Sequence, residues 1–126
     1  MKRTIKSLLL AVLITFAGTT SAFAHAKVLS TTPSAGSILT HWPSQVSIRF
    51  NEPILKLSGA VVDWAYVKNS QGRRVDTGNP KVSGAFLTVG LKSSAKSGKY
   101  SVQYRAVSDD GHPVSGIFTF VYLPSK

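Results

Sequence analysis

Residues 97–122 read SGKYSVQYRAVSDDGHPVSGIFTFVY, which is two runs of alternating residues separated by a polar turn. In the first run, apolar and aromatic residues recur at every second position from 100 to 106, with polar residues between them. In the second run, Phe118, Phe120 and Tyr122 share one side. Successive side chains of a β-strand point to opposite faces, so a period of two in β-branched and aromatic residues predicts two strands.

The same period of two recurs in three earlier segments of the chain, at 46–50, 61–66 and 87–91. Turn compositions rich in Gly, Pro, Ser and Asn separate these segments, and no stretch after residue 24 carries a sustained apolar stripe of helical period. We therefore predict an all-β fold, an immunoglobulin-like Greek-key β-sandwich or barrel of about seven strands. Since the chain has no cysteine, it is not a true immunoglobulin domain.

The first 24 residues have the organisation of a secretory signal peptide. Basic residues open the chain, an apolar core follows at 8–17, and Ser21-Ala22-Phe23-Ala24 presents small residues where signal peptidase cuts. The apolar core is shorter than the ~20 residues that span a bilayer, so we expect no permanent membrane anchor. We predict a signal peptide at 1–24, one domain at 25–126, and export to the periplasm.

Composition limits the chemistry of the exported domain. The chain has no cysteine, and its only methionine is Met1, which excludes disulfides, thiol nucleophiles and sulfur ligands after cleavage. The chain has 15 basic and 5 acidic residues, and loss of Lys2, Arg3 and Lys6 with the signal peptide leaves a net charge of +7. Because these charges are scattered and the domain is exported, we predict a solvated basic surface and no nucleic-acid partner.

Cleavage after Ala24 would make His25 the first residue of the domain. A terminal histidine offers its α-amine and its imidazole Nδ1 to one metal ion, whereas the nitrogen of an internal histidine is part of an amide. The two other histidines are His41, expected to be exposed in a loop, and His112.

His112 lies in the turn between the last two strands, in the segment Asp109-Asp110-Gly111-His112-Pro113. With a locally extended backbone, Asp110 and His112 project to the same side and present a carboxylate and an imidazole to one ion. The alternative is a plain turn in which the aspartate caps its own backbone. Asp109 is expected to be a solvated neighbour.

Four segments carry a resemblance to a known family: His25-Ala26-Lys27-Val28, STTPSAGS at 30–37, IRFNEPI at 48–54, and SGKYSVQYRAVSDDGHPVSGIFTF at 97–120. The sequence from 25 to 122 resembles the CopC, PcoC and YobA family of periplasmic copper-resistance proteins. The resemblance implies a β-sandwich that binds one Cu(II) per mature chain through a histidine brace. In this chain the brace would be His25 with two nitrogens and His112 with a third, and Asp110 would be an axial ligand or hydrogen-bonding partner.

Cu(II) prefers tetragonal nitrogen and oxygen donors, which agrees with this ligand set. The ligand nitrogens must be deprotonated, so copper affinity should fall in acid. Glu52 matches an acidic position near the metal in part of the family, and we favour a solvent-exposed carboxylate there, with contact to the copper shell as the alternative. A separate methionine-rich Cu(I) site is not expected.

We therefore expect a monomeric periplasmic Cu(II) buffer or chaperone for copper resistance and homeostasis rather than an enzyme. Family resemblance suggests a CopD-like membrane transporter as partner. Two other classes stay open, a brace-type copper monooxygenase and a metal-free sandwich that mediates interactions. Delivery, storage and sequestration of copper are not distinguished by the sequence.

Overall fold

The computed structural model describes residues 25–57, 61–93 and 96–126, so the predicted signal peptide lies outside the described residues. These residues form eight strands: β1 (Val28–Thr32), β2 (Ile38–Leu39), β3 (Gln45–Phe50), β4 (Trp64–Lys68), β5 (Lys81–Ser83), β6 (Phe86–Gly90), β7 (Gly98–Val107) and β8 (Pro113–Tyr122). None of the described residues belongs to a helix that could span a membrane.

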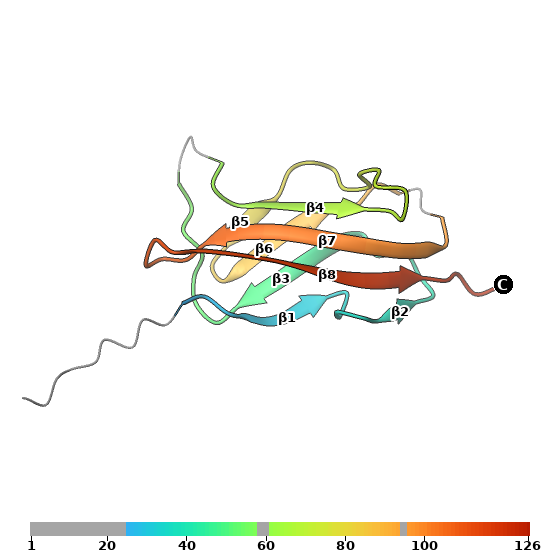
Figure 1. The fold of residues 1–126 in the computed structure, drawn as a ribbon, viewed down its shortest axis with the longest axis horizontal. Coiled ribbons are helices and arrows are strands. Elements are labelled where there is room, and N and C mark those ends of the chain that lie inside the picture. The colour runs from blue at the N-terminus through green and yellow to red at the C-terminus, as the bar shows by residue number, and fades with distance from the viewer. Residues whose placement is uncertain (1–24, 58–60, 94–95) are drawn as a thin grey trace, which may run out of the picture.

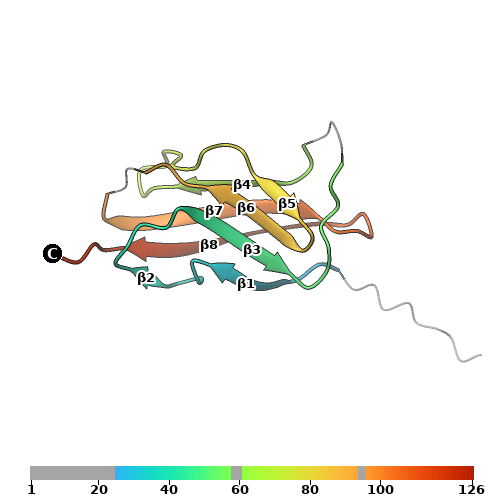
Figure 2. The same ribbon diagram turned by 180° about the vertical axis from the view of Figure 1, so that it is seen from behind.

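The strands are arranged in two four-stranded sheets (Figures 1 and 2), with the orders β1-β3-β6-β5 and β2-β8-β7-β4. Neighbouring strands are antiparallel except β2 and β8, which are parallel. The architecture confirms the predicted all-β sandwich, with eight strands in place of about seven.

β7 and β8 form the longest antiparallel ladder of the two sheets. Their pairing runs without a register shift from Gly98↔Tyr122 to Val107↔Pro113. The turn between them therefore lies at one end of the sandwich, where the chain also enters β1 (Figure 1).

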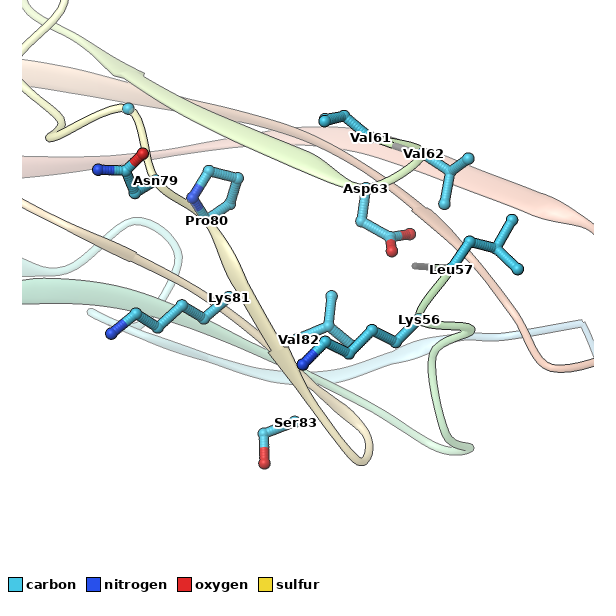
Figure 3. A pocket seen from close by; sticks show the side chains of 11 residues that line it. Lys56, Leu57, Val61, Val62, Asp63, Asn79, Pro80, Lys81, Val82 and Ser83 are labelled. Atoms are coloured by element: carbon cyan, nitrogen blue, oxygen red, sulfur yellow. The ribbon is translucent and has the colours of Figure 1, made fainter. Parts of the chain in front are cut away.

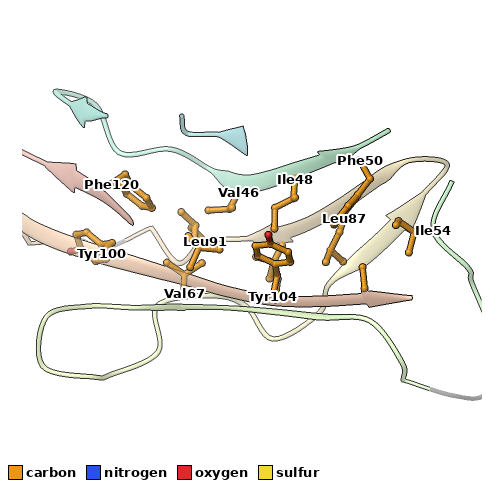
Figure 4. Packing of buried hydrophobic residues seen from close by; sticks show 14 of the residues in the cluster. Val46, Ile48, Phe50, Ile54, Val67, Leu87, Leu91, Tyr100, Tyr104 and Phe120 are labelled. Carbon is orange, nitrogen blue, oxygen red and sulfur yellow. The ribbon is translucent and has the colours of Figure 1, made fainter. Parts of the chain in front are cut away.

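The core lies between the two sheets (Figure 4) and is built by the inward-facing positions of the alternating strands. Burial alternates along β3, where Val46, Ile48 and Phe50 are at most 1% exposed. Across the gap, Val102 and Phe120 are fully buried. This pattern is what a period of two dictates when one face of each sheet packs on the other. The remaining core residues are Ala26, Ile54, Ala65, Val67, Leu87, Val89, Leu91, Tyr100, Tyr104 and Ala106.

Strand β4 differs from its predicted position, because it begins at Trp64 rather than near residue 61 and continues to Lys68. Just before β4, hydrogen bonds that involve side chains take the place of backbone hydrogen bonds between the strands. Arg105 Nη1 donates to the carbonyl oxygen of Val62 at 2.5 Å, and the Val107 N–H donates to Asp63 Oδ1 at 2.8 Å. Residues 61–63 therefore alternate in the sequence as a strand would, but they do not belong to the ladder between β4 and β7.

Gly116 allows an aromatic ring to lie across β8. It pairs with Tyr104 on β7, and a Cβ atom at Gly116 would lie 2.7 Å from Tyr104 Cζ and 3.1 Å from Cε1. Tyr104 is 9% exposed and packs edge-on against Phe50. The missing side chain at 116 therefore makes room for this ring.

We predict that Gly116→Ala destabilises the domain by about 1–3 kcal/mol, because the extra methyl group overpacks the contact with Tyr104. Urea denaturation followed by tryptophan fluorescence measures the free energy of unfolding. Ser115→Ala, at the exposed neighbouring position, is the control and should change stability little. A Gly116→Ala protein as stable as the parent would contradict this packing argument.

Candidate metal centre

Three metal-ligating side chains gather at the end of the sandwich that carries the β7–β8 turn. His25 precedes β1, and Asp110 and His112 lie in the turn. Each offers one ligand atom, and these atoms lie within 4.8 Å of one another. The imidazole centroids of His25 and His112 are 4.9 Å apart, and the rings are inclined at 75°. All three residues are exposed, so an ion could reach them from solvent.

His25 is positioned by the residues that follow it. Ala26 is 5% exposed and belongs to the core. Lys27 is held at both backbone groups, since its N–H donates to Asn51 Oδ1 at 2.6 Å and its carbonyl accepts from the Asn51 N–H at 2.9 Å. The backbone is therefore fixed within two residues of His25, and only the histidine itself extends from the sheet edge.

The turn from Ser108 to His112 is tight, which corrects the expectation of an extended backbone. The Gly111 N–H donates to the Ser108 carbonyl at 2.8 Å, and Gly111 has a φ of 85°, a conformation that favours glycine. The Ser108 N–H donates to the His112 carbonyl at 3.0 Å and closes the turn. Asp110 and His112 face each other because of this turn rather than because of strand periodicity.

The chain after β3 holds the turn from the other sheet. The Leu55 N–H donates to the Val107 carbonyl at 2.8 Å, and the Asp109 N–H donates to the Pro53 carbonyl at 3.3 Å. Ile54 forms an isolated antiparallel bridge with the fully buried Ser108. These bonds connect the turn to residues that also hold the segment before β1.

Asp110 makes both kinds of contact that its sequence pattern suggested. Its Oδ1 accepts from the His112 N–H at 3.0 Å, as in an Asx turn, and also from the Ser108 hydroxyl. Its Oδ2 lies 3.2 Å from His112 Nδ1. The hydrogen bond from Ser108, followed by that from the His112 N–H, lowers the pKa of Asp110 to about 2. The carboxylate is therefore charged in any mild acid.

Glu52 differs from the solvent-exposed carboxylate that we favoured. It is partly buried, and its Oε1 is a buried atom with no hydrogen-bond partner among the described residues. It is not part of the three-residue cluster, but it precedes Pro53, whose carbonyl accepts from Asp109. The sequence did not indicate this burial, because an acidic residue at a strand end is normally solvated.

The structure also shows where the third histidine lies and which residues hold the cluster without having been predicted to do so. His41 is exposed, as expected, and its Nδ1 lies 3.1 Å from the Thr40 hydroxyl. Asn51 and Ser108 hold the cluster but were not predicted to do so, because a single Asn or Ser near a strand end carries no specific signal. A hollow of about 640 Å³ elsewhere on the described residues is lined by Lys56, Asp63, Lys81 and further polar and apolar side chains (Figure 3), and none of the three clustered residues lines it.

The donors at the cluster are imidazole nitrogens and a carboxylate oxygen. Such a set suits Cu(II) and other borderline divalent ions, and no thiolate or thioether is present to favour Cu(I). The Asp110–His112 contact also orients the imidazole, as carboxylates do for metal-binding histidines. The site is thus chemically suited to bind an exchangeable cation.

Comparison with known proteins identifies a family and several copper proteins. The family model described as the CopC domain matches residues 28–122. The chain is 38% identical over 125 residues to the copper transport protein CutJ of Bacillus subtilis, which covers 95% of this chain and 22% of CutJ. This chain therefore spans only about a fifth of that relative. It is 32% identical over 112 residues to protein YobA of Escherichia coli K12, with 88% of this chain and 89% of YobA covered.

Solved structures share the fold. The crystal structure of CopC from Methylosinus trichosporium OB3b superposes with a TM-score of 0.70 at 25% identity, covering 81% of this chain and 97% of that chain. PcoC from Escherichia coli, a methionine-rich copper resistance protein, superposes with a TM-score of 0.63 at 24% identity, covering 79% of this chain and all of that one. The two-sheet arrangement is therefore that of CopC structures.

We predict that Ser108→Ala raises the pKa of Asp110 from about 2 toward the ordinary aspartate value of about 3.9, because the Ser108 hydroxyl bond is the largest cause of the lowering. A carbon-detected NMR titration of the Asp110 carboxyl group in the metal-free protein measures it. Ser115→Ala, on the exposed side of β8, is the control and should leave the Asp110 titration in place. An unchanged titration in Ser108→Ala would contradict the assigned cause.

Proposed function

The chain belongs to the CopC domain family, and on that premise we propose that its mature form, beginning at His25, binds one Cu(II) ion with the clustered side chains. The observation that carries this proposal is the gathering of His25, Asp110 and His112 within 4.8 Å from two distant parts of the chain. Only three histidines are present in the whole sequence, and two of them meet here.

Each ligand has a distinct role in the proposed site. The α-amine and Nδ1 of His25 form a chelate ring, and an imidazole nitrogen of His112 completes a set of three nitrogens, a histidine brace. Asp110 contributes its carboxylate as an axial ligand or through its contact with His112 Nδ1. Glu52 is proposed to support the site from its partly buried position beside Pro53, where its Oε1 has no hydrogen-bond partner among the described residues.

We propose export to the periplasm, where the protein acts as a monomeric copper buffer or chaperone in copper resistance. The names of the relatives support a role in copper resistance or transport. The exposed ligands favour exchange of the ion with solvent or with a partner, for which a CopD-like membrane transporter is the candidate. We propose no catalytic role.

The copper proposal is tested first at the free amino terminus. Protein beginning at His25 should bind one equivalent of Cu(II), and protein with Ala24 retained should bind more than about a hundredfold more weakly, because one arm of the chelate is lost while both imidazoles remain. Competition titration against a copper chelator of known affinity gives both constants. Intact mass confirms each terminus.

His112→Ala is expected to weaken binding similarly, and His41→Ala is its matched control, since His41 is an exposed histidine remote from the cluster. Electron paramagnetic resonance should report nitrogen ligands in the parent and in His41→Ala. Equal copper affinity in the parent, His112→Ala and the Ala24-retaining protein would refute the brace.

Copper affinity is also predicted to depend on pH. Copper affinity should fall from about pH 8 to pH 5, because protons compete for the ligand nitrogens. Asp110 stays ionised throughout, since its folded pKa of about 2 lies below this window. Asp110→Asn should bind copper about 10–100-fold more weakly than the parent at pH 8. A parent affinity that does not fall between pH 8 and pH 5 would contradict proton competition at the ligand nitrogens.

A further inference from the structure

Most of the acidic side chains lie at one end of the sandwich, where Lys27, Lys56 and Arg105 also lie. Of the five acidic residues, four lie at the histidine end: Glu52, Asp63, Asp109 and Asp110. The fifth, Asp76, has a side chain with 0% exposure and is bonded to Arg74 at 2.5 Å. No acidic side chain is therefore exposed at the opposite end, and all five acidic residues belong to the described part of the chain.

The opposite end is basic. It comprises the end of β4, the loop that follows, the loop before β7 and the chain terminus, all on the side marked C in Figure 1. We call this surface the basic end; its cations are Lys68, Arg73, Arg74, Lys92, Lys96, Lys99 and Lys126. Seven of the twelve basic residues that follow residue 24 therefore lie at one end of the domain.

The basic end is hollowed rather than flat. A depression of about 270 Å³ is lined by Arg73, Arg74, Lys92 and Lys96 together with Val75 and uncharged polar side chains. A second depression of about 90 Å³ shares Lys96 with the first and adds Lys99. Asp76 offsets only the charge of Arg74, so the excess positive charge at this surface is uncompensated.

The loop that carries two of these cations is held in place. Asn69 Oδ1 accepts from the N–H groups of Gln71 and Arg73 at 3.0 and 2.9 Å. Arg73 Nη2 donates to Gln71 Oε1 at 3.0 Å, and the Arg74 guanidinium lies 4.3 Å from the ring centroid of Tyr66. Because the loop is ordered before any ligand arrives, binding an anion costs little conformational entropy.

We propose that the basic end docks the exported domain on an anionic phospholipid bilayer. The proposal rests on the export proposed above, since an exported basic domain meets membrane phosphates rather than nucleic acid. The cations spread over several loops and two depressions, which matches an array of headgroup phosphates better than one small anion. Basic residues gain from an anionic bilayer only within a Debye length, about 8 Å at physiological salt, so the docked end must be the basic one.

Docking in this orientation has a consequence for the metal centre. The histidine cluster lies in the β7–β8 turn at the far end of the sandwich (Figure 1), where four acidic residues accompany Lys27, Lys56 and Arg105 and weaken the attraction to an anionic surface. His25 and His112 therefore face the aqueous compartment while the domain stays at the membrane.

The test is binding of the exported, mature protein to vesicles of phosphatidylglycerol and phosphatidylcholine in equal parts, compared with phosphatidylcholine alone, by sedimentation. The variant Arg73→Gln/Lys92→Gln/Lys96→Gln should lower the vesicle partition coefficient about a hundredfold, because each basic residue near an anionic surface contributes about fivefold. The matched control, Arg49→Gln/Lys56→Gln/Lys81→Gln, removes one arginine and two lysines elsewhere and should stay within about twofold of the parent. His112→Ala should bind vesicles like the parent, which separates docking from copper binding.

Three outcomes would overturn the proposal. In the first, the parent protein binds phosphatidylcholine vesicles as strongly as vesicles that contain phosphatidylglycerol. In the second, both triple variants lose binding equally, which would indicate net charge alone. In the third, inorganic phosphate at the same phosphate concentration shifts the NMR signals of Arg73, Lys92 and Lys96 as strongly as vesicles do, which would indicate a small-anion site. Copper titration of each triple variant verifies that the fold and the metal centre are intact.

Discussion

The five residues after β3, Asn51 to Leu55, form hydrogen bonds with both chain segments that carry the clustered histidines. Asn51 holds Lys27, and Pro53 and Leu55 hold the beginning of the β7–β8 turn. This connection is itself anchored, because Phe50 before it and Ile54 within it are buried in the core. The distance between His25 and His112 is therefore set by the packing of the sandwich and not by either ligand segment alone.

This anchoring explains how the exposed side chains of the candidate metal centre have a defined geometry. The backbone is ordered within two residues of His25, and the turn around His112 is closed by its own hydrogen bonds. Asp110 is bonded on one oxygen and faces the imidazole with the other. A preorganised donor set of this kind binds an ion at lower entropic cost while leaving it open to exchange.

An antiparallel sandwich has two ends, and this chain uses them differently. Loops at strand ends are free of packing constraints, so charge and ligands accumulate there. One end carries His25, His112 and four acidic residues, and the other carries seven of the twelve basic residues that follow residue 24. The ladder between β7 and β8 separates the two ends by ten paired positions and keeps both in fixed orientation.

The sequence alone determined the sandwich and the types of ligand, because period-two alternation reports which face of a strand is buried, and the absence of sulfur restricts any metal to nitrogen and oxygen donors. It did not reveal the strands of two and three residues, β2 and β5, since so short a run carries no period. The family resemblance predicted that His25 and His112 meet, and the packing of the sandwich is what brings their rings to 4.9 Å. Only the tertiary structure decided that Glu52 is partly buried and that seven of the twelve basic residues after residue 24 collect at one end. Residues far apart in sequence become neighbours through strand order and register, and these depend on long-range packing that no local pattern encodes.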